Sequence, residues 1–478
     1  MPAACGAETT SVSRGNGSVW AANRGPVARL QRSCTILGRR QAPITKPEWG
    51  CRQEMGRSQT YNDETDHAGW LVRCTGCGFR RRNPMPDYCQ RCGAPLEVEL
   101  DYGEDLQAER LFDGCITDLW KYGSLYPVSL SHSVDLSLGE GGTPLVRASK
   151  AAQQIGVEEA WCKCDHLNPS GSFKDRSAAV GVVWACERGY PGVICASSGN
   201  AAGATATYAA RAGLPAYVVI SSRAPKSKLA VAVAHGARVY SVAGDFSRAF
   251  AAAREAATEV GLANVTTTYV NCYAYEGNKS VAYELYEQME VVPEWVVVPV
   301  GSGPLLYGVW KGFRELRRFG LVDKIPRLLA VQPEGCAPIA RAFATGEEVK
   351  PWYRVDTVVS GIDDPLQGYE RDGTLTLVAV RESGGAALAV PDHEILKAGR
   401  VLAHEEGMFV EPAAAASVAG AAAAKRSGYI AGSGAVVCLL TGHGLKYQWE
   451  SRHQAEFETV RDEVELVGAI EKDLGNNA

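Results

Sequence analysis

The residues whose types and spacing point most directly to chemistry surround Lys174. The segment 168–176 reads NPSGSFKDR and places one lysine in a loop of small residues at the start of a predicted helix. A lysine that forms a Schiff base must be held in place, partly desolvated and able to lose its proton. For any single lysine the plain alternative is a solvated surface charge. This loop favours a nucleophilic amine that bonds a carbonyl group.

A second polar loop, 196–200 (ASSGN), lies between a predicted strand and a predicted helix. Asn200 follows a glycine turn there, where its amide can hydrogen-bond an oxygen on a ring-shaped ligand. The alternative is that Asn200 caps the helix that follows it, and one side chain can do both.

A glycine-rich turn follows the predicted strand 295–300 and precedes a predicted helix, 305–319. The turn consists of Gly301, Ser302 and Gly303. Backbone N–H groups at the start of a helix bind phosphate, helped by the helix dipole. Pro304 removes one of these donors. The turn predicts a phosphate site, although ordinary strand–helix turns also contain glycines.

Thr441 follows the last predicted strand, 435–440. A neutral hydroxyl at this place can hydrogen-bond a nitrogen atom of a ring-shaped ligand without keeping that nitrogen protonated. Such a partner weakens an electron sink and suits elimination and replacement more than transamination. An ordinary turn at a strand end is the alternative.

Four cysteines have the spacing of a closed metal site: Cys74, Cys77, Cys89 and Cys92. Two Cys-x-x-Cys pairs, each followed by a glycine, suit a tetrahedral zinc ribbon. Four thiolates leave no open position on the ion, so we expect a structural zinc. Free thiols are the alternative.

Short apolar runs alternate with helical patterns through the chain from residue 144 onwards. The predicted strands are 192–196, 216–220, 238–242, 295–300, 328–331 and 435–440. The predicted helices are 201–212, 228–235, 246–260 and 305–319. This alternation predicts an α/β fold with open, mainly parallel sheets. Ligands bind such sheets beyond the carboxyl ends of the strands, where most of the motifs above lie.

Length and composition bound the remaining possibilities. The chain has 478 residues, which suggests about three structural units. The net charge of −5 predicts no nucleic-acid partner, and no apolar run is long enough to predict a membrane span. The 15 cysteines in so long a chain suit the reducing cytoplasm better than a secreted disulfide framework.

Residues 1–67 are rich in arginine, glycine and serine and poor in acids. We expect a disordered extension there, with a targeting segment or a misplaced start as alternatives. Residues 68–100 form the expected zinc ribbon, 101–450 a catalytic domain of two subdomains, and 451–478 a charged tail.

These motifs together resemble the threonine synthase family over about residues 70–447. The resemblance includes the cysteine pairs, the lysine loop and five further segments. These are 138–145 (LGEGGTPL), 276–280 (EGNKS), 296–301 (VVVPVG), 411–413 (EPA) and 440–446 (LTGHGLK). It implies the type II fold of pyridoxal phosphate (PLP) enzymes and the conversion of O-phosphohomoserine and water into threonine and phosphate. It also implies a catalytic Lys174 as Schiff base and proton shuttle. Asn200 would contact the ring oxygen, the Gly301 loop the cofactor phosphate, and Thr441 the ring nitrogen.

The sequence departs from this family where the substrate phosphate would be bound. Ala274, Ala201 and Leu305 stand where the family places polar donors, and the segment 361–365 (GIDDP) is acidic. Tyr275, Ser302 and Arg176 are the residues that could replace these donors. The departures predict poor handling of O-phosphohomoserine.

Three functions remain open at this point. The first is a PLP lyase or synthase that acts on an amino acid by β- or γ-elimination or replacement, with threonine synthase as its leading form. The others are a hydroxyamino-acid dehydratase and a non-catalytic binding protein. For the enzymes we expect a small-molecule amino-acid substrate and a homodimer.

Overall fold

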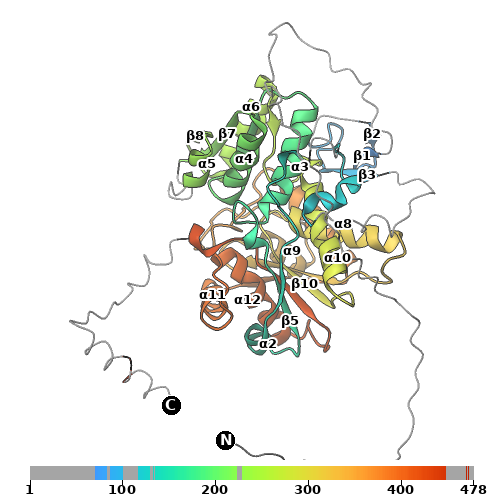
Figure 1. The fold of residues 1–478 in the computed structure, drawn as a ribbon, viewed down its shortest axis with the longest axis vertical. Coiled ribbons are helices and arrows are strands. Elements are labelled where there is room, and N and C mark those ends of the chain that lie inside the picture. Colours follow the sequence, from blue (N-terminus) through green and yellow to red (C-terminus); the bar gives the residue numbers. More distant parts are fainter. Residues whose placement is uncertain are drawn as a thin grey trace, which may run out of the picture. The chain divides into compact units, whose positions relative to one another are not determined.

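The computed structural model describes residues 70–82, 87–100, 117–129, 133, 135–222, 229–447, 470 and 472. The predicted extension 1–67 and nearly all of the predicted tail 451–478 lie outside these residues. Within them, the strands form three sheets (Figure 1).

The first sheet is a small antiparallel one with the strand order β2-β1-β3. Its strands are β1 (Trp70–Cys74), β2 (Arg80–Arg81) and β3 (Leu96–Leu100). The two cysteine pairs lie at the turns of this sheet, in the place predicted for a zinc ribbon.

The second sheet has six strands in the order β12-β11-β10-β13-β5-β4. They are β4 (Leu145–Arg147), β5 (Ala160–Lys163), β10 (Trp295–Pro299), β11 (Arg327–Pro333), β12 (Ala386–Val390) and β13 (Val436–Leu439). All neighbours are parallel except β4 and β5.

Helices cover both faces of this six-stranded sheet. Successive residues of β10 alternate between two apolar clusters, with Val296 in one and Val297 in the other. The Val297 cluster includes α2 (Ser149–Ile155), α11 (Asp392–Glu405) and α12 (Pro412–Arg426). The Val296 cluster includes α7 (Ser280–Gln288), α8 (Pro304–Arg318), α9 (Pro338–Thr345) and α10 (Glu370–Glu382).

The third sheet has four parallel strands in the order β8-β7-β6-β9. They are β6 (Val193–Ala196), β7 (Ala216–Ser221), β8 (Arg238–Val242) and β9 (Ala263–Asn264). The helices near it are α3 (Lys174–Glu187), α4 (Asn200–Ala212), α5 (Ala230–Ala234) and α6 (Phe246–Val260).

The predicted fold class is therefore confirmed: two open, mainly parallel sheets accompany a small N-terminal antiparallel one. The predicted strand 238–242 and helix 246–260 coincide with β8 and α6. Among the helices that the structure describes, none has the length and apolar character that crossing a membrane requires.

Candidate active site and metal centre

A cavity of about 870 Å³ lies beyond the carboxyl ends of strands from both parallel sheets. Ala196 ends β6, Ser221 ends β7 and Pro299 ends β10, and all three line the cavity. Every residue predicted from the sequence to bind the cofactor also lines it: Lys174, Asn200, Gly301, Ser302, Gly303 and Thr441. The fold thus brings together loops that lie far apart in the sequence.

Lys174 is the first residue of α3 and lies partly buried in the cavity wall. Its Nζ donates a hydrogen bond to Thr267 Oγ1 at 2.7 Å. Burial lowers the pKa of Lys174 to about 8, against the opposing effect of Cys195, Asp364 and Glu411. A substantial fraction of this amine is therefore neutral near pH 7–8, as a nucleophile requires.

The lysine loop is fixed by backbone contacts with the segment after β13. Phe173 N donates to Thr441 O at 3.0 Å, and His443 N donates to Gly171 O at 3.0 Å. At the other side of the loop, the Asp175 carboxylate accepts from Ser170 N at 2.6 Å. The position of Thr441 in the cavity is consequently locked to that of Lys174.

Asn200 begins α4, and its side chain is oriented by a carboxylate. Asn200 Nδ2 donates to Glu411 Oε1 at 2.6 Å, from the residue that precedes α12. An amide nitrogen has two N–H donors, so this contact leaves one for a ligand. The sequence analysis did not assign Glu411 a role, although it belongs to a segment shared with the threonine synthase family.

The 301–303 loop precedes α8. The carbonyl oxygens of its first two residues accept hydrogen bonds from side chains that lie outside the cavity lining. Gln332 Nε2 donates to Gly301 O at 3.2 Å, and Thr376 Oγ1 donates to Ser302 O at 2.6 Å. The C=O and N–H of a trans peptide point in opposite directions. The N–H groups of Ser302 and Gly303 therefore point away from Gln332 and Thr376.

Gly303 must be a glycine at this turn. Its φ is +109°, and a Cβ built there would overlap the Thr376 side chain. Two oriented amides and a helix N-terminus suit a phosphate group. Together with the Lys174 amine, they fit pyridoxal phosphate.

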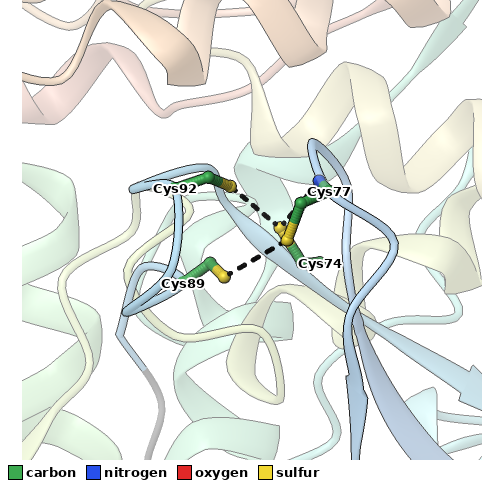
Figure 2. Close-up of side chains that lie close together, drawn as sticks. All are labelled: Cys74, Cys77, Cys89 and Cys92. Carbon is green, nitrogen blue, oxygen red and sulfur yellow. Dashed lines mark hydrogen bonds between the residues drawn. The ribbon is translucent and has the colours of Figure 1, made fainter.

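The four cysteines form a second candidate site, shown in Figure 2. Their Sγ atoms all lie within 4.8 Å of one another, with 3.4 Å between Cys74 and Cys92 and 3.8 Å between Cys77 and Cys89. Tetrahedral zinc–thiolate bonds place sulfur atoms about 3.8 Å apart. The donor set and its spacing therefore fit one zinc ion.

The glycine after each cysteine pair adopts the expected knuckle turn. Gly78 has φ +69° and Gly93 has φ +70°. Gly78 N donates to Cys74 O at 3.0 Å, and Gly93 N donates to Cys89 O at 2.7 Å. Burial raises the pKa of the Cys74 thiol, whereas the backbone amide of Ala94 lowers that of Cys92. A bound cation favours the thiolate form of all four.

Comparison with known proteins agrees with this site. Residues 136–442 match a protein family described as pyridoxal-phosphate dependent enzyme. The chain belongs to this family. It is 37% identical over 380 residues to threonine synthase from Methanosarcina acetivorans, covering 78% of this chain and 92% of that protein. It is 36% identical over 381 residues to threonine synthase from Methanocaldococcus jannaschii, covering 79% and 93%. The predicted resemblance to threonine synthase is confirmed, and the chain is a PLP-dependent, threonine-synthase-like enzyme.

Solved structures support the type II PLP fold. Maize serine racemase aligns with a TM-score of 0.55 at 24% identity, over 70% of this chain and 93% of that chain. The processed form of threonine deaminase isoform 2 from Solanum lycopersicum aligns with a TM-score of 0.54 at 24% identity, over 65% and 81%. The shared fold places the strand ends of both parallel sheets around one cavity.

The departures from the threonine synthase pattern fall into two groups. Ala201 and Leu305 line the cavity of this PLP enzyme. Ala274 is outside the lining and is buried against α3, where a Cβ built on Gly181 would lie 2.9 Å from Ala274 Cβ. A polar donor at 274 would thus have to enter a packed interior, and the sequence alone gave no sign of this.

Two of the three predicted substitute donors are occupied elsewhere. Tyr275 is buried and donates to Leu96 O at 2.5 Å. Arg176 is fully buried and pairs with Asp165 at 2.8 Å and Glu284 at 2.5 Å. Ser302 alone of the three lines the cavity.

The cavity of this PLP enzyme also carries the acidic pair predicted from the sequence, Asp363 and Asp364. Asp364 lies against the 301–303 loop, since a Cβ built on Gly301 would lie 3.3 Å from Asp364 Cβ. Burial raises the pKa of Asp364, while hydrogen bonds from Tyr369 and Leu366 act against that rise.

Proposed function

We propose that this enzyme converts O-phosphohomoserine and water into threonine and phosphate, with Lys174 as its catalytic residue. The position of the Lys174 amine carries the proposal. It lies in one cavity with an oriented amide, a phosphate-type loop and a threonine hydroxyl, and its pKa is lowered to about 8. The similarity to two threonine synthases supports the choice of reaction.

Lys174 has two tasks in this proposal. Its neutral amine would hold PLP covalently through the cofactor's aldehyde, and the same amine would take and return protons at substrate carbon atoms. Thr267 Oγ1, 2.7 Å from Nζ, holds the amine toward the cavity. When bound, PLP supplies the electron sink that makes those carbon-bound protons acidic.

The surrounding residues bind and orient. Asn200, fixed by Glu411, would donate its second N–H to the ring oxygen. The N–H groups of Ser302 and Gly303 would hold the cofactor phosphate. Thr441 would offer the ring nitrogen a neutral hydroxyl, which favours elimination and replacement over transamination.

Covalent trapping tests the lysine. Borohydride reduction of the purified protein, followed by peptide mapping, is expected to place the pyridoxyl group on Lys174. Lys174→Ala should abolish the adduct, whereas Lys150→Ala, at an exposed lysine on α2, should leave it intact. An adduct on another lysine would overturn the assignment.

Arg354 is the strongest candidate for binding the substrate phosphate. It is the only arginine lining the cavity among the described residues. Its exposed guanidinium makes no hydrogen bond or ion pair within the part of the chain that the structure describes. Lys446 also lines the cavity and adds positive charge.

Steady-state kinetics test this role. Hydrogen bonds to charged groups are worth about 1.5–3 kcal/mol, so Arg354→Gln is expected to raise KM for O-phosphohomoserine about 10- to 100-fold. Arg354→Lys should retain part of the affinity, because it keeps the charge. An unchanged KM in Arg354→Gln would refute the role of this residue.

A second candidate function is the dehydration of a hydroxyamino acid such as serine or threonine. The acidic pair at 363–364 and the apolar Ala201 and Leu305 favour it, because they oppose a phosphorylated substrate. Incubation with O-phosphohomoserine, O-phosphoserine, threonine and serine separates the two functions. Threonine and phosphate indicate the first, and ammonia from threonine or serine indicates the second.

The proposal also covers metal, domains and assembly. Zinc is bound by Cys74, Cys77, Cys89 and Cys92, with residues 68–100 as the ribbon and 101–450 as the catalytic domain. A cytoplasmic homodimer completes the proposal. Elemental analysis tests the metal, and light scattering tests the dimer.

A further inference from the structure

A chain of hydrogen bonds and helix contacts joins the cysteine cluster to residues 301–303, the proposed phosphate loop. Tyr88 directly precedes the predicted zinc ligand Cys89. Its hydroxyl leaves the ribbon and donates to Asp372 Oδ2 at 3.2 Å, on α10. The contact spans 284 residues of sequence.

Asp372 is the next member of the chain and is fully buried, with 0% of its surface exposed. Its Oδ2 also accepts from Tyr269 N at 3.1 Å, and its Oδ1 has no hydrogen-bond partner among the described residues. The Asp372 carboxylate thus depends on the Tyr88 hydroxyl and the Tyr269 amide for its position.

Thr376, one helical turn after Asp372, completes the connection. Its Oγ1 lies 2.8 Å from the Tyr269 hydroxyl and donates to Ser302 O at 2.6 Å. Gly303 packs against the same side chain. A shift of α10 at Asp372 therefore moves the group that orients the Gly303 N–H.

The ribbon also holds α8, the helix that the phosphate loop begins. The Glu97 carboxylate of β3 accepts from the Tyr307 hydroxyl, and Lys311 Nζ donates to Val98 O at 2.5 Å. Tyr269 and Tyr307 pack edge to face with ring centroids 5.6 Å apart, which ties this second contact to the first. The first contact leads through Thr376 to the Ser302 carbonyl, and the second ends on Tyr307 and Lys311 of α8, which begins at Pro304.

We propose that Tyr88 and Asp372 are positioning residues that couple the metal site to the phosphate loop, so that zinc and PLP bind cooperatively. The metal fixes the knuckle that carries Tyr88, and Tyr88 in turn fixes Asp372, α10 and the Ser302 carbonyl. Such a coupling is reciprocal: each ligand must raise the affinity for the other by the same factor. The inference rests on the zinc and phosphate assignments of the proposed function.

The coupling is measured by titration of cofactor-free protein with PLP, followed by absorbance. Removal of zinc with a chelator is expected to raise the dissociation constant of PLP about tenfold, within the usual range for coupled sites. In the reverse experiment, a competing chelator measures zinc affinity with and without PLP. The two factors should agree.

Tyr88→Phe separates positioning from folding, because it removes one hydroxyl and leaves all four cysteines. It is expected to retain zinc and to weaken PLP binding about fivefold. Tyr122→Phe is the matched control. It removes a buried tyrosine hydroxyl that donates to Glu287 on α7, outside the hydrogen bonds that link the ribbon to the loop, and should leave PLP affinity unchanged.

Equal PLP affinity in zinc-loaded and zinc-free protein would overturn the inference, as would a Tyr88→Phe variant that matches Tyr122→Phe. Protein that binds no zinc, or no PLP, would contradict the proposed assignments themselves. Zinc and PLP that both bind but independently would contradict only the coupling.

Discussion

Replacing Lys174, the proposed catalytic residue, with methionine is expected to stabilise the cofactor-free protein. Lys174 lies partly buried in the cavity wall, and burial lowers its pKa from 10.5 to about 8. An amine that resists protonation in the folded state raises the free energy of that state at neutral pH. Methionine has a similar length and no charge, so Lys174→Met removes this cost while it abolishes covalent attachment of PLP.

The magnitude follows from the pKa. At about 1.4 kcal/mol for each pH unit, a fall from 10.5 to about 8 costs about 3 kcal/mol at pH 7. The substitution also removes the 2.7 Å hydrogen bond to Thr267, and this loss reduces the gain in stability by about 1 kcal/mol. We therefore expect a net gain of about 2 kcal/mol in the free energy of unfolding.

The gain should depend on pH in a specific direction. Between pH 8 and 10.5 the folded wild type binds fewer protons at this amine than the unfolded chain does, so its stability rises through that window. The methionine variant lacks this rise. Its advantage is therefore full below pH 8 and is lost near pH 10.5, where the missing hydrogen bond to Thr267 leaves the variant slightly less stable than wild type.

Urea unfolding of cofactor-free wild type and variant, at several pH values from 7 to 10.5, measures the difference. Lys350→Met, at an exposed lysine paired with Glu347, is the matched control and should show a change near zero at every pH. A Lys174→Met variant that is less stable than wild type at pH 7, or equally shifted at all pH values, would refute the reasoning.

Three further predictions concern the buried ion pairs, the phosphate loop and the metal site. Glu284→Gln should lower the free energy of unfolding by about 3–5 kcal/mol, because it leaves the buried Arg176 guanidinium without this charged partner; a loss below about 1 kcal/mol in urea unfolding would contradict this. Gly303→Ala should weaken PLP binding about tenfold or more, since φ is +109° and the Cβ overlaps Thr376; an unchanged dissociation constant in PLP titration counts against the proposed cradle. Cys77→Ser should lower both the zinc content, expected at about one ion per chain in wild type, and the melting temperature. Elemental analysis that finds wild-type zinc in this variant would exclude Cys77 as a ligand.

Local spacing was enough to predict the elements that carry the chemistry. The lysine loop, the Gly301 turn and the segment after β13 each lie at the end of a strand or the start of a helix, and the pattern of apolar runs predicted most of those junctions closely. The Cys-x-x-Cys pairs predicted the cysteine cluster because each knuckle is closed by a few consecutive residues. Loops and turns that consecutive residues form could therefore be predicted from the sequence.

Contacts between segments that lie far apart in the sequence could not be predicted from the sequence. Glu411 orients Asn200 from 211 residues away, and Tyr88 meets Asp372 across 284. The sequence analysis treated Ala274 as a lost phosphate donor, but the fold buries it against α3, outside the cavity lining.

Residue type and spacing predicted a nucleophilic lysine and a phosphate-type loop, and they also predicted the four-cysteine cluster that the structure shows. Only the tertiary structure decided which side chains orient them, because a strand–helix pattern fixes where a residue lies along the chain but not what packs against it. No sequence motif marks Gln332 or Thr376 as a partner of the 301–303 loop. Their side chains nevertheless bind the Gly301 and Ser302 carbonyls from outside the cavity lining. Sheet order and helix packing bring such partners within hydrogen-bond distance, and these depend on the whole chain at once.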